Sequence, residues 1–127
     1  MESHWFFIMK ENIIKDKSFD FAVRIVNLYK HLVGAKREFI ISKQMLRSGT
    51  SVGALIRESE HAESKSDFVH KMAIAQKEIN ETLYWFELLK ATNYLTEEQF
   101  TNINKDAIEI IKLITTIIKT TKSKIND

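Results

Sequence analysis

The sequence contains no proline and no cysteine, and only three of its 127 residues are glycine. Proline and glycine are the residues that most often mark turns and interrupt helices, so their scarcity favours long, unbroken helices. The lack of cysteine excludes disulfides and thiolate metal sites, which fits a reducing compartment. Long apolar runs are also missing, since Trp5–Met9 is too short for a signal-peptide core or a membrane span. We therefore expect a cytoplasmic, helical protein with no membrane partner.

The residues that are present are sufficient for one hydrophobic core. Hydrophobic residues make up 44% of the chain and charged residues 28%, which is ordinary for a globular protein. A chain of this length fits one domain with a shared core, and no repeat or low-complexity linker divides it. We predict a single domain over residues 1–127, in which residues 1–16 form an apolar N-terminal arm.

Four helices follow from the residues that begin and end helices. Gly34 closes a periodic apolar run, as a helix-ending glycine does. Ser64–Asp67 and Thr96–Gln99 have the form of capping boxes, with Ser66 alone as the alternative cap at the first of them. Ser18 is the expected cap of the first helix. The predicted helices span about 18–33, 37–63, 66–93 and 97–122, and their short joints predict an all-α fold, an antiparallel up-down-up-down four-helix bundle.

The first and last predicted helices are apolar over more of their circumference than one core contact requires. Such a contact needs an arc of roughly 100°, whereas the apolar residues between positions 107 and 118 cover roughly 220°. In the first helix we place Phe19, Ala22, Val26, Tyr29 and Val33 toward the core. The surplus predicts self-association, through an oligomer interface that contains Phe21, Ile25, Leu28, Leu32, Ile110 and Leu113. The alternative is that Trp5–Met9 folds back and covers this surface within one chain.

The stretch "RSGTSVGALIRES", residues 47–59, places two glycines inside a predicted helix. Each interior glycine costs about 1 kcal/mol relative to alanine. Gly49 and Gly53 are four residues apart and share one edge of the helix, so a neighbouring backbone or a large ring can approach there. The rings of Tyr84, Trp85 and Phe86 are the candidates. A phosphate-binding loop is excluded because no strand precedes the stretch and no glycine-lysine-serine ending follows it.

No arrangement in the sequence is specific for catalysis or for a metal. Glu58 and His61 have the spacing used in di-iron bundles, but the motif occurs once and lies opposite the apolar stripe. Glu78 and Glu81 beside an aromatic run could serve acid–base chemistry. The favoured interpretation is an ion pair with Arg47 or Arg57 of the preceding helix. We expect a non-enzymatic protein without cofactor or metal.

Two segments, "DKSFDFAVRIVNLYK" at 16–30 and "QMLRSGTSVGALIRESEHAESKSDFVHKMAIAQKEINETLYWFELL" at 44–89, resemble the four-helix-bundle family encoded in intervening sequences of 23S ribosomal RNA genes. The most specific positions are Arg47–Ser48, Ser51–Val52, Ala54, Ile56, Glu78, Glu81–Thr82 and Trp85. Leu55 stands where members often have asparagine. The resemblance implies a left-handed bundle and a ring-like homopentamer. It also extends to the accessory proteins of diversity-generating retroelements, which bind nucleic acid through a basic surface.

The charge distribution suggests where nucleic acid would bind. The formal net charge is only +2, but residues 110–124 contain four lysines and no acid. A solvated helix end with cations suited to its dipole is the alternative. If phosphates are bound, we expect the contacts from Arg24, Lys105, Lys112, Lys119 and Lys122, with Arg47 and Arg57 added only if they are not paired to acids. The predicted role is an oligomeric accessory or scaffold that binds RNA or DNA weakly, and the alternative is a protein-interaction scaffold without nucleic-acid affinity.

Overall fold

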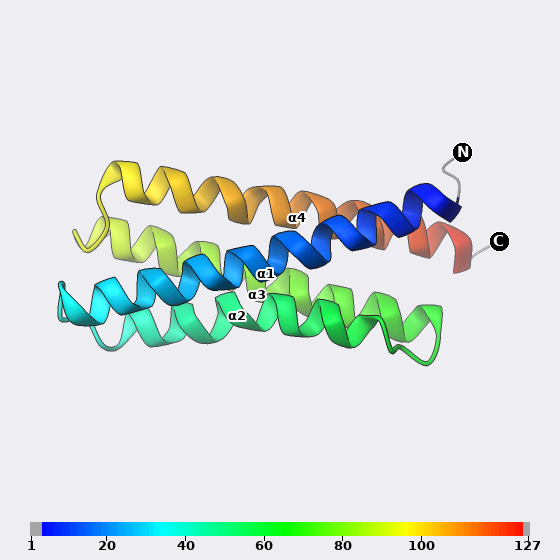
Figure 1. Cartoon of the computed structure of the whole chain (residues 1–127), viewed down its shortest axis with the longest axis horizontal. Coiled ribbons are helices and arrows are strands. Elements are labelled where there is room, and N and C mark those ends of the chain that lie inside the picture. The colour runs from blue at the N-terminus through cyan, green and yellow to red at the C-terminus, as the bar shows by residue number, and fades with distance from the viewer. Residues whose placement is uncertain (1–3, 126–127) are drawn as a thin grey trace.

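The computed structural model describes residues 4–125, with side chains over residues 8–124, and consists of four α-helices. No strand occurs in this described range, so the predicted all-α class is confirmed. Consecutive helices lie side by side and run in opposite directions (Figure 1). The first and third helices each pack against both the second and the fourth. The helices are α1 (His4–Gly34), α2 (Ile41–Ser59), α3 (Lys65–Ala91) and α4 (Glu97–Ile125).

Helix α1 begins much earlier than the sequence analysis placed it. It is continuous from His4, so the segment 4–16 belongs to the helix instead of forming a separate arm, and Trp5–Met9 does not fold back over the bundle. Ser18 is wrong as a helix cap. It lies in the middle of α1, is buried, and donates its hydroxyl to the Lys15 carbonyl at 3.0 Å. The helix continues upstream because Ile14, one turn before Ser18, is fully buried in the core.

The other helix ends follow the predicted signals more closely. The Ser64 hydroxyl accepts from the Asp67 N–H at 3.0 Å and caps α3. At α4 the Thr96 hydroxyl accepts from the Gln99 N–H at 3.1 Å, and the Gln99 side chain accepts from the Thr96 N–H at 2.9 Å. These reciprocal bonds form the capping box expected at α4. Helix α2 is shorter than predicted, because it begins only at Ile41 and ends at Ser59.

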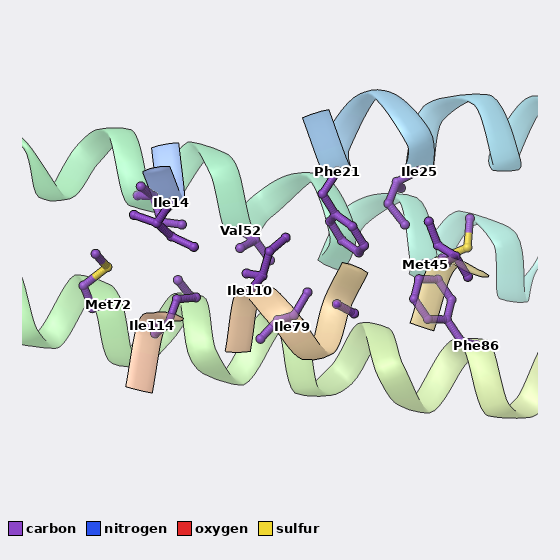
Figure 2. Close-up of a cluster of buried hydrophobic side chains, with 14 of the residues drawn as sticks. Ile14, Phe21, Ile25, Met45, Val52, Met72, Ile79, Phe86, Ile110 and Ile114 are labelled. Atoms are coloured by element: carbon purple, nitrogen blue, oxygen red, sulfur yellow. The ribbon is translucent and has the colours of Figure 1, made fainter. Parts of the chain in front are cut away.

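The core runs along the bundle axis and receives side chains from all four helices (Figure 2). Helices α2 and α3 each bury a narrow apolar stripe: Met45, Val52 and Ile56 on α2, and Met72, Ala75, Ile79, Phe86 and Leu89 on α3. Ile41, Phe68 and Leu83 are partly buried against the core. Phe21 and Phe86 meet edge to face with ring centroids 6.3 Å apart. Such aromatic pairs add about 0.5–1.5 kcal/mol beyond their buried area.

The core-facing side of α1 is rotated relative to the predicted one. Phe21, Ile25 and Leu32 are buried, whereas Phe19 is exposed. The other residues that were predicted to face the core are only partly buried: Ala22, Val26, Tyr29 and Val33. The glycines of α2 explain this orientation. A Cβ at Gly49 would lie 2.9 Å from the Ile25 side chain, and one at Gly53 would lie 3.3 Å from the Ser18 carbonyl oxygen. The close approach predicted at these glycines is therefore made by α1, and the prediction that the α3 aromatic rings fill the space is wrong.

Candidate functional site

Helix α4 is divided into an acidic half and a basic half. Its residues 97–109 carry four acids and one lysine, whereas residues 110–124 carry four lysines and no acid. The cations lie at the C-terminal end of the helix, where they also interact favourably with the helix dipole. Consequently the C-terminal half of α4 is locally basic although the net charge of the chain is only +2.

Three predicted contact residues, Lys112, Lys119 and Lys122, form what we call the lysine ridge. All three are exposed, and none makes an ion pair with the residues that the structure describes. Lys112 and Lys119 are seven residues apart, which places them about 10 Å apart along the same side of the helix. Hydroxyl groups accompany them, including Thr115, which accepts a hydrogen bond from the Gln76 amide at 2.9 Å. The ridge can therefore contact successive phosphates without breaking internal ion pairs.

The other two predicted contact residues lie in a network of charges between α1 and α4. Arg24 forms an ion pair with Asp106 and donates to the Asn102 side-chain oxygen at 2.7 Å. Lys105 lies beside Glu109 and helps to lower the pKa of that carboxyl group. Both cations are thus offset by nearby acids, which makes Arg24 and Lys105 poorer phosphate ligands than the ridge lysines. Sequence alone did not reveal the partner of Arg24, because Asp106 lies on a helix distant in sequence, whereas Glu109 lies one turn from Lys105 in the same helix.

An ion pair within the same α1–α4 contact involves Lys17 and Glu109. The hydrogen bond from Lys17 lowers the pKa of Glu109, and the same bond raises the pKa of Lys17. Both side chains are largely exposed, so this pair contributes little to stability. It fixes the register of α1 on α4 more than it strengthens the contact.

The predicted ion pair between α2 and α3 is confirmed for Arg47. Its guanidinium contacts Glu78 at 3.1 Å and Glu81 at 2.5 Å, and Glu81 also accepts from the Trp85 indole N–H at 3.0 Å. The indole hydrogen bond and then the Arg47 contacts lower the pKa of Glu81. Arg57 does not join this cluster, since it lies over the Phe19 ring at 5.2 Å. Arg47 is therefore held by two acids and is not available to phosphates.

A buried hydroxyl pair lies beneath that cluster. Ser48 and Thr82 are fully buried and lie 2.8 Å apart, and Thr82 donates to the Glu78 carbonyl at 2.8 Å. The Ser48 hydroxyl can then donate to Thr82, so both polar groups are satisfied inside an apolar core. These two residues, with Arg47, Glu78, Glu81 and Trp85, include most of the polar positions that carry the family resemblance, and the structure gives them a structural role between two helices.

The sequence analysis did not identify the buried carboxylate of Glu38, which precedes α2. Glu38 is only 7% exposed and accepts the backbone N–H groups of Ile40, Ile41 and Ser42 at 3.1, 2.8 and 2.7 Å. Burial alone would raise the pKa of Glu38, but these donors outweigh it and hold the pKa below its usual range. Glu38 therefore caps α2 from outside the helix. A glutamate at this position has no established capping signature, so the sequence offered little signal.

Most of the predicted interface residues belong to the core of the single chain. Phe21, Ile25, Leu32 and Ile110 are buried, and Leu28 and Leu113 are partly buried against them. For Phe21, Ile25, Leu32 and Ile110 the assignment to an exposed interface is wrong, because their side chains are buried in the core of the bundle. Within residues 8–124, the exposed large apolar side chains are Ile8, Ile13, Phe19, Val23, Phe39, Ile40 and Tyr84.

The described residues contain no group of three or more acids or histidines that could hold a metal ion. Glu58 and His61 do not share a helix, since α2 ends at Ser59. No helix in the described range is long and apolar enough to cross a membrane. The side chains that form polar clusters make ion pairs or caps, as described above.

Residues 10–116 match the sequence model of the protein family described as "23S rRNA-intervening sequence protein". No curated protein matches the chain. Among solved structures it is similar to the crystal structure of a protein with unknown function from the S23 ribosomal protein family of Bacteroides thetaiotaomicron VPI-5482. The two sequences are 61% identical, the match covers 87% of this chain and 98% of that one, and the TM-score is 0.86. The chain belongs to the family of 23S rRNA-intervening sequence proteins.

Proposed function

We propose that this chain is a non-enzymatic, self-associating bundle that binds RNA or DNA weakly through the lysine ridge and serves as an accessory or scaffold. The observation that carries the proposal is the acid-free half of α4, where Lys112, Lys119 and Lys122 are exposed and without ion pairs in the described part of the chain. Phosphate contacts supply most of the affinity in binding that is independent of sequence. The accessory role extends the likeness to the retroelement proteins, which use a basic surface in the same way.

Self-association is the second part of the proposal, with a homopentamer as the expected assembly. It is supported by the large apolar side chains that α1, the α1–α2 loop and α3 expose, among which Phe39 and Ile40 are adjacent, because contiguous exposed apolar surface marks an interaction site. One ridge provides few phosphate contacts. Several copies on one nucleic acid would raise the overall affinity through effective concentration, without any new contact.

The test is a fluorescence-anisotropy titration of generic single-stranded and duplex RNA at about 50 and about 200 mM salt. We expect the affinity to fall steeply between these conditions, because each neutralised phosphate releases counterions. The double variant Lys112→Glu/Lys119→Glu should bind at least about tenfold more weakly at the lower salt concentration, with a smaller salt dependence. Its oligomer mass should equal that of the wild type.

The matched control is Lys30→Glu/Lys77→Glu, which changes the net charge by the same amount at exposed lysines of α1 and α3. If the control loses as much affinity as the ridge variant, binding follows net charge and the ridge is the wrong site. If the wild type does not bind at the lower salt concentration, the protein is a scaffold without nucleic-acid affinity.

A further inference from the structure

The loop between α1 and α2 exposes the most accessible large apolar residue in the described structure. Ile40 is 78% exposed and its neighbour Phe39 is 50% exposed. We call these two residues the finger. Burying exposed isoleucine and phenylalanine side chains is favourable, because apolar surface is removed from water. A pair of them at one end of a bundle is therefore a candidate contact surface.

Hydrogen bonds hold the finger in one conformation. Glu38 accepts three backbone N–H groups in the loop and the first turn of α2, and its own N–H donates to the Leu32 carbonyl at 2.9 Å. The Ser42 hydroxyl donates to the Glu38 carbonyl at 2.8 Å. Arg37 adopts a φ of 58°, which is uncommon for a residue with a side chain. The loop is thus prearranged, so little conformational freedom remains to be lost on docking.

Along the sequence the finger is flanked by cations, while the adjacent acid, Glu38, is turned inward. Lys36, Arg37 and Lys43 are exposed and make no ion pair within the described residues, and the Arg37 guanidinium lies 5.1 Å from the centre of the Phe39 ring. The carboxylate of Glu38 is already occupied by the backbone. The surface presented to solvent is therefore apolar at its tip and positive at its base, and it fits an apolar groove with an acid at the rim.

The chain itself contains such a groove, between α1 and α4. It has a volume of about 440 Å³ and is lined by Leu28, by the buried Ile103, by the amides of Asn27, Gln99 and Asn102, by Glu98, and by Arg24, whose charge is already paired with Asp106. Glu98 is exposed and makes no ion pair in the part of the chain that the structure describes.

His31 also lines this groove, and its Nε2 atom is buried without a hydrogen-bond partner among the described residues. A buried polar atom without a partner is destabilising and rare. A peptide group or side chain entering the groove would supply the partner that this nitrogen lacks. The groove thus combines apolar lining, one acid without a partner and one unsatisfied polar atom.

We propose that the finger of one copy docks in the α1–α4 groove of a second copy. This inference rests on the self-association in the proposed function and names its contact. The apolar tip matches Leu28 and Ile103, and the cations at its base match Glu98. The finger and the groove are different surfaces, so the contact is heterologous, and repeated contacts of this type close into a ring when the rotation between copies allows it.

The test measures mass against concentration by sedimentation equilibrium for the full chain. Ile40→Gln should raise the dissociation constant of the assembly about 10- to 100-fold, because one apolar side chain no longer becomes buried. Tyr84→Gln, which alters another exposed apolar residue on α3, is the matched control and should leave the constant unchanged. Both positions are exposed, and circular dichroism should show unchanged helix content.

A mixing experiment then tests the direction of the contact. Ile40→Gln copies retain an intact groove, and Glu98→Lys copies retain an intact finger, so each alone should dissociate. Mixed in equal amounts at a concentration where both are monomeric, they should form pairs, since one intact finger meets one intact groove. A mixture that stays monomeric overturns the proposal.

The sedimentation results distinguish a failure of self-association from a failure of the finger contact. If the wild type is monomeric at about 100 μM, self-association itself is wrong, and the finger contact is wrong with it. If the wild type assembles and Ile40→Gln assembles equally well, self-association stands and the finger is not its contact. Loss of mass in Tyr84→Gln alone would place the interface on α3 and also contradict the finger.

Discussion

Glu38 shows how one residue can organise a junction between two helices. Its carboxylate accepts the backbone N–H groups of Ile40, Ile41 and Ser42, which the first turn of α2 would otherwise leave without partners. It does so from a buried position, so the charged form depends on these donors. The same bonds orient the exposed side chains of the loop. A single carboxylate thus contributes both to the stability of α2 and to the shape of the finger.

Because the pKa of Glu38 is lowered in the folded protein, its contribution depends on pH. It is fully present above the unfolded pKa of about 4.3 and is lost as the pH falls through the lower folded value. We expect Glu38→Gln to lower the free energy of unfolding by about 1–3 kcal/mol near pH 6. Near pH 3 the difference from the wild type should be smaller. Urea unfolding of both proteins at the two pH values measures it, and an equal difference at both would contradict the assignment.

Other single-residue roles were predictable where the partner lies one helix away. Arg47 was expected to meet Glu78 and Glu81 because their helices are consecutive and antiparallel, and this pairing is confirmed. Arg24 was assigned to a phosphate contact because its neutralising acid lies on a helix distant in sequence. Lys105 was assigned there although Glu109 lies one turn away in the same helix. Asp106 meets Arg24 only through the contact between the first and last helices. An ion pair between two helices that are far apart in sequence can be predicted only when the register of one helix on the other is known.

At the scale of elements, the glycines of α2 decide how α1 sits. Gly49 faces the buried side chain of Ile25, and Gly53 faces the backbone of Ser18. A larger residue on this edge would move α1 outward. The position of α1 in turn determines which of its apolar residues face the core and which face solvent.

Replacing Gly49 tests this packing. Gly49→Ala gains up to about 1 kcal/mol of helix propensity, but its Cβ would meet three Ile25 carbons at 2.9–3.0 Å. Overpacking of this kind typically costs about 1–3 kcal/mol, so we expect net destabilisation. In an Ile25→Ala background the clash is absent, and the same substitution should stabilise. Thermal or urea unfolding of the four proteins of this double-mutant cycle gives the coupling energy.

Gly34→Ala is the matched control for that cycle. Its Cβ would have no atom within 4 Å, and its φ is not positive. It should therefore leave stability unchanged or raise it by up to about 1 kcal/mol. A destabilisation equal to that of Gly49→Ala would show that loss of glycine, and not contact with Ile25, is responsible.

The helices themselves were largely predictable, but the face of α1 was not. The core stripes of α2 and α3 are narrow, and their apolar residues are buried or partly buried. Helix α1 is apolar around much of its circumference, so periodicity alone allows several orientations. Its early start was missed because a serine resembling a cap, Ser18, lies within it. In the structure that serine is a small buried residue opposite Gly53.

At the scale of the whole molecule, the surface proposed to bind nucleic acid is separate from the surfaces proposed to form the assembly. The lysine ridge lies on the C-terminal half of α4, whereas the finger and the groove involve the α1–α2 loop and the N-terminal half of α4. In Figure 1 these lie toward opposite ends of the bundle, with the α1–α2 loop at the left and the end of α4 at the right. A substitution at one surface therefore leaves the other intact. The affinity for nucleic acid and the mass of the assembly can be altered independently.

This separation leads to a prediction about the assembly as a binding unit. If several ridges act on one nucleic acid, Ile40→Gln should weaken RNA binding at least about tenfold at protein concentrations where it dissociates, although no lysine has changed. Lys112→Glu/Lys119→Glu should weaken binding with the mass unaltered. Anisotropy and sedimentation of the same samples distinguish the two effects. Avidity is lost when the ridges are no longer linked. Equally tight RNA binding by the wild type and by fully dissociated Ile40→Gln would therefore show that each copy binds alone.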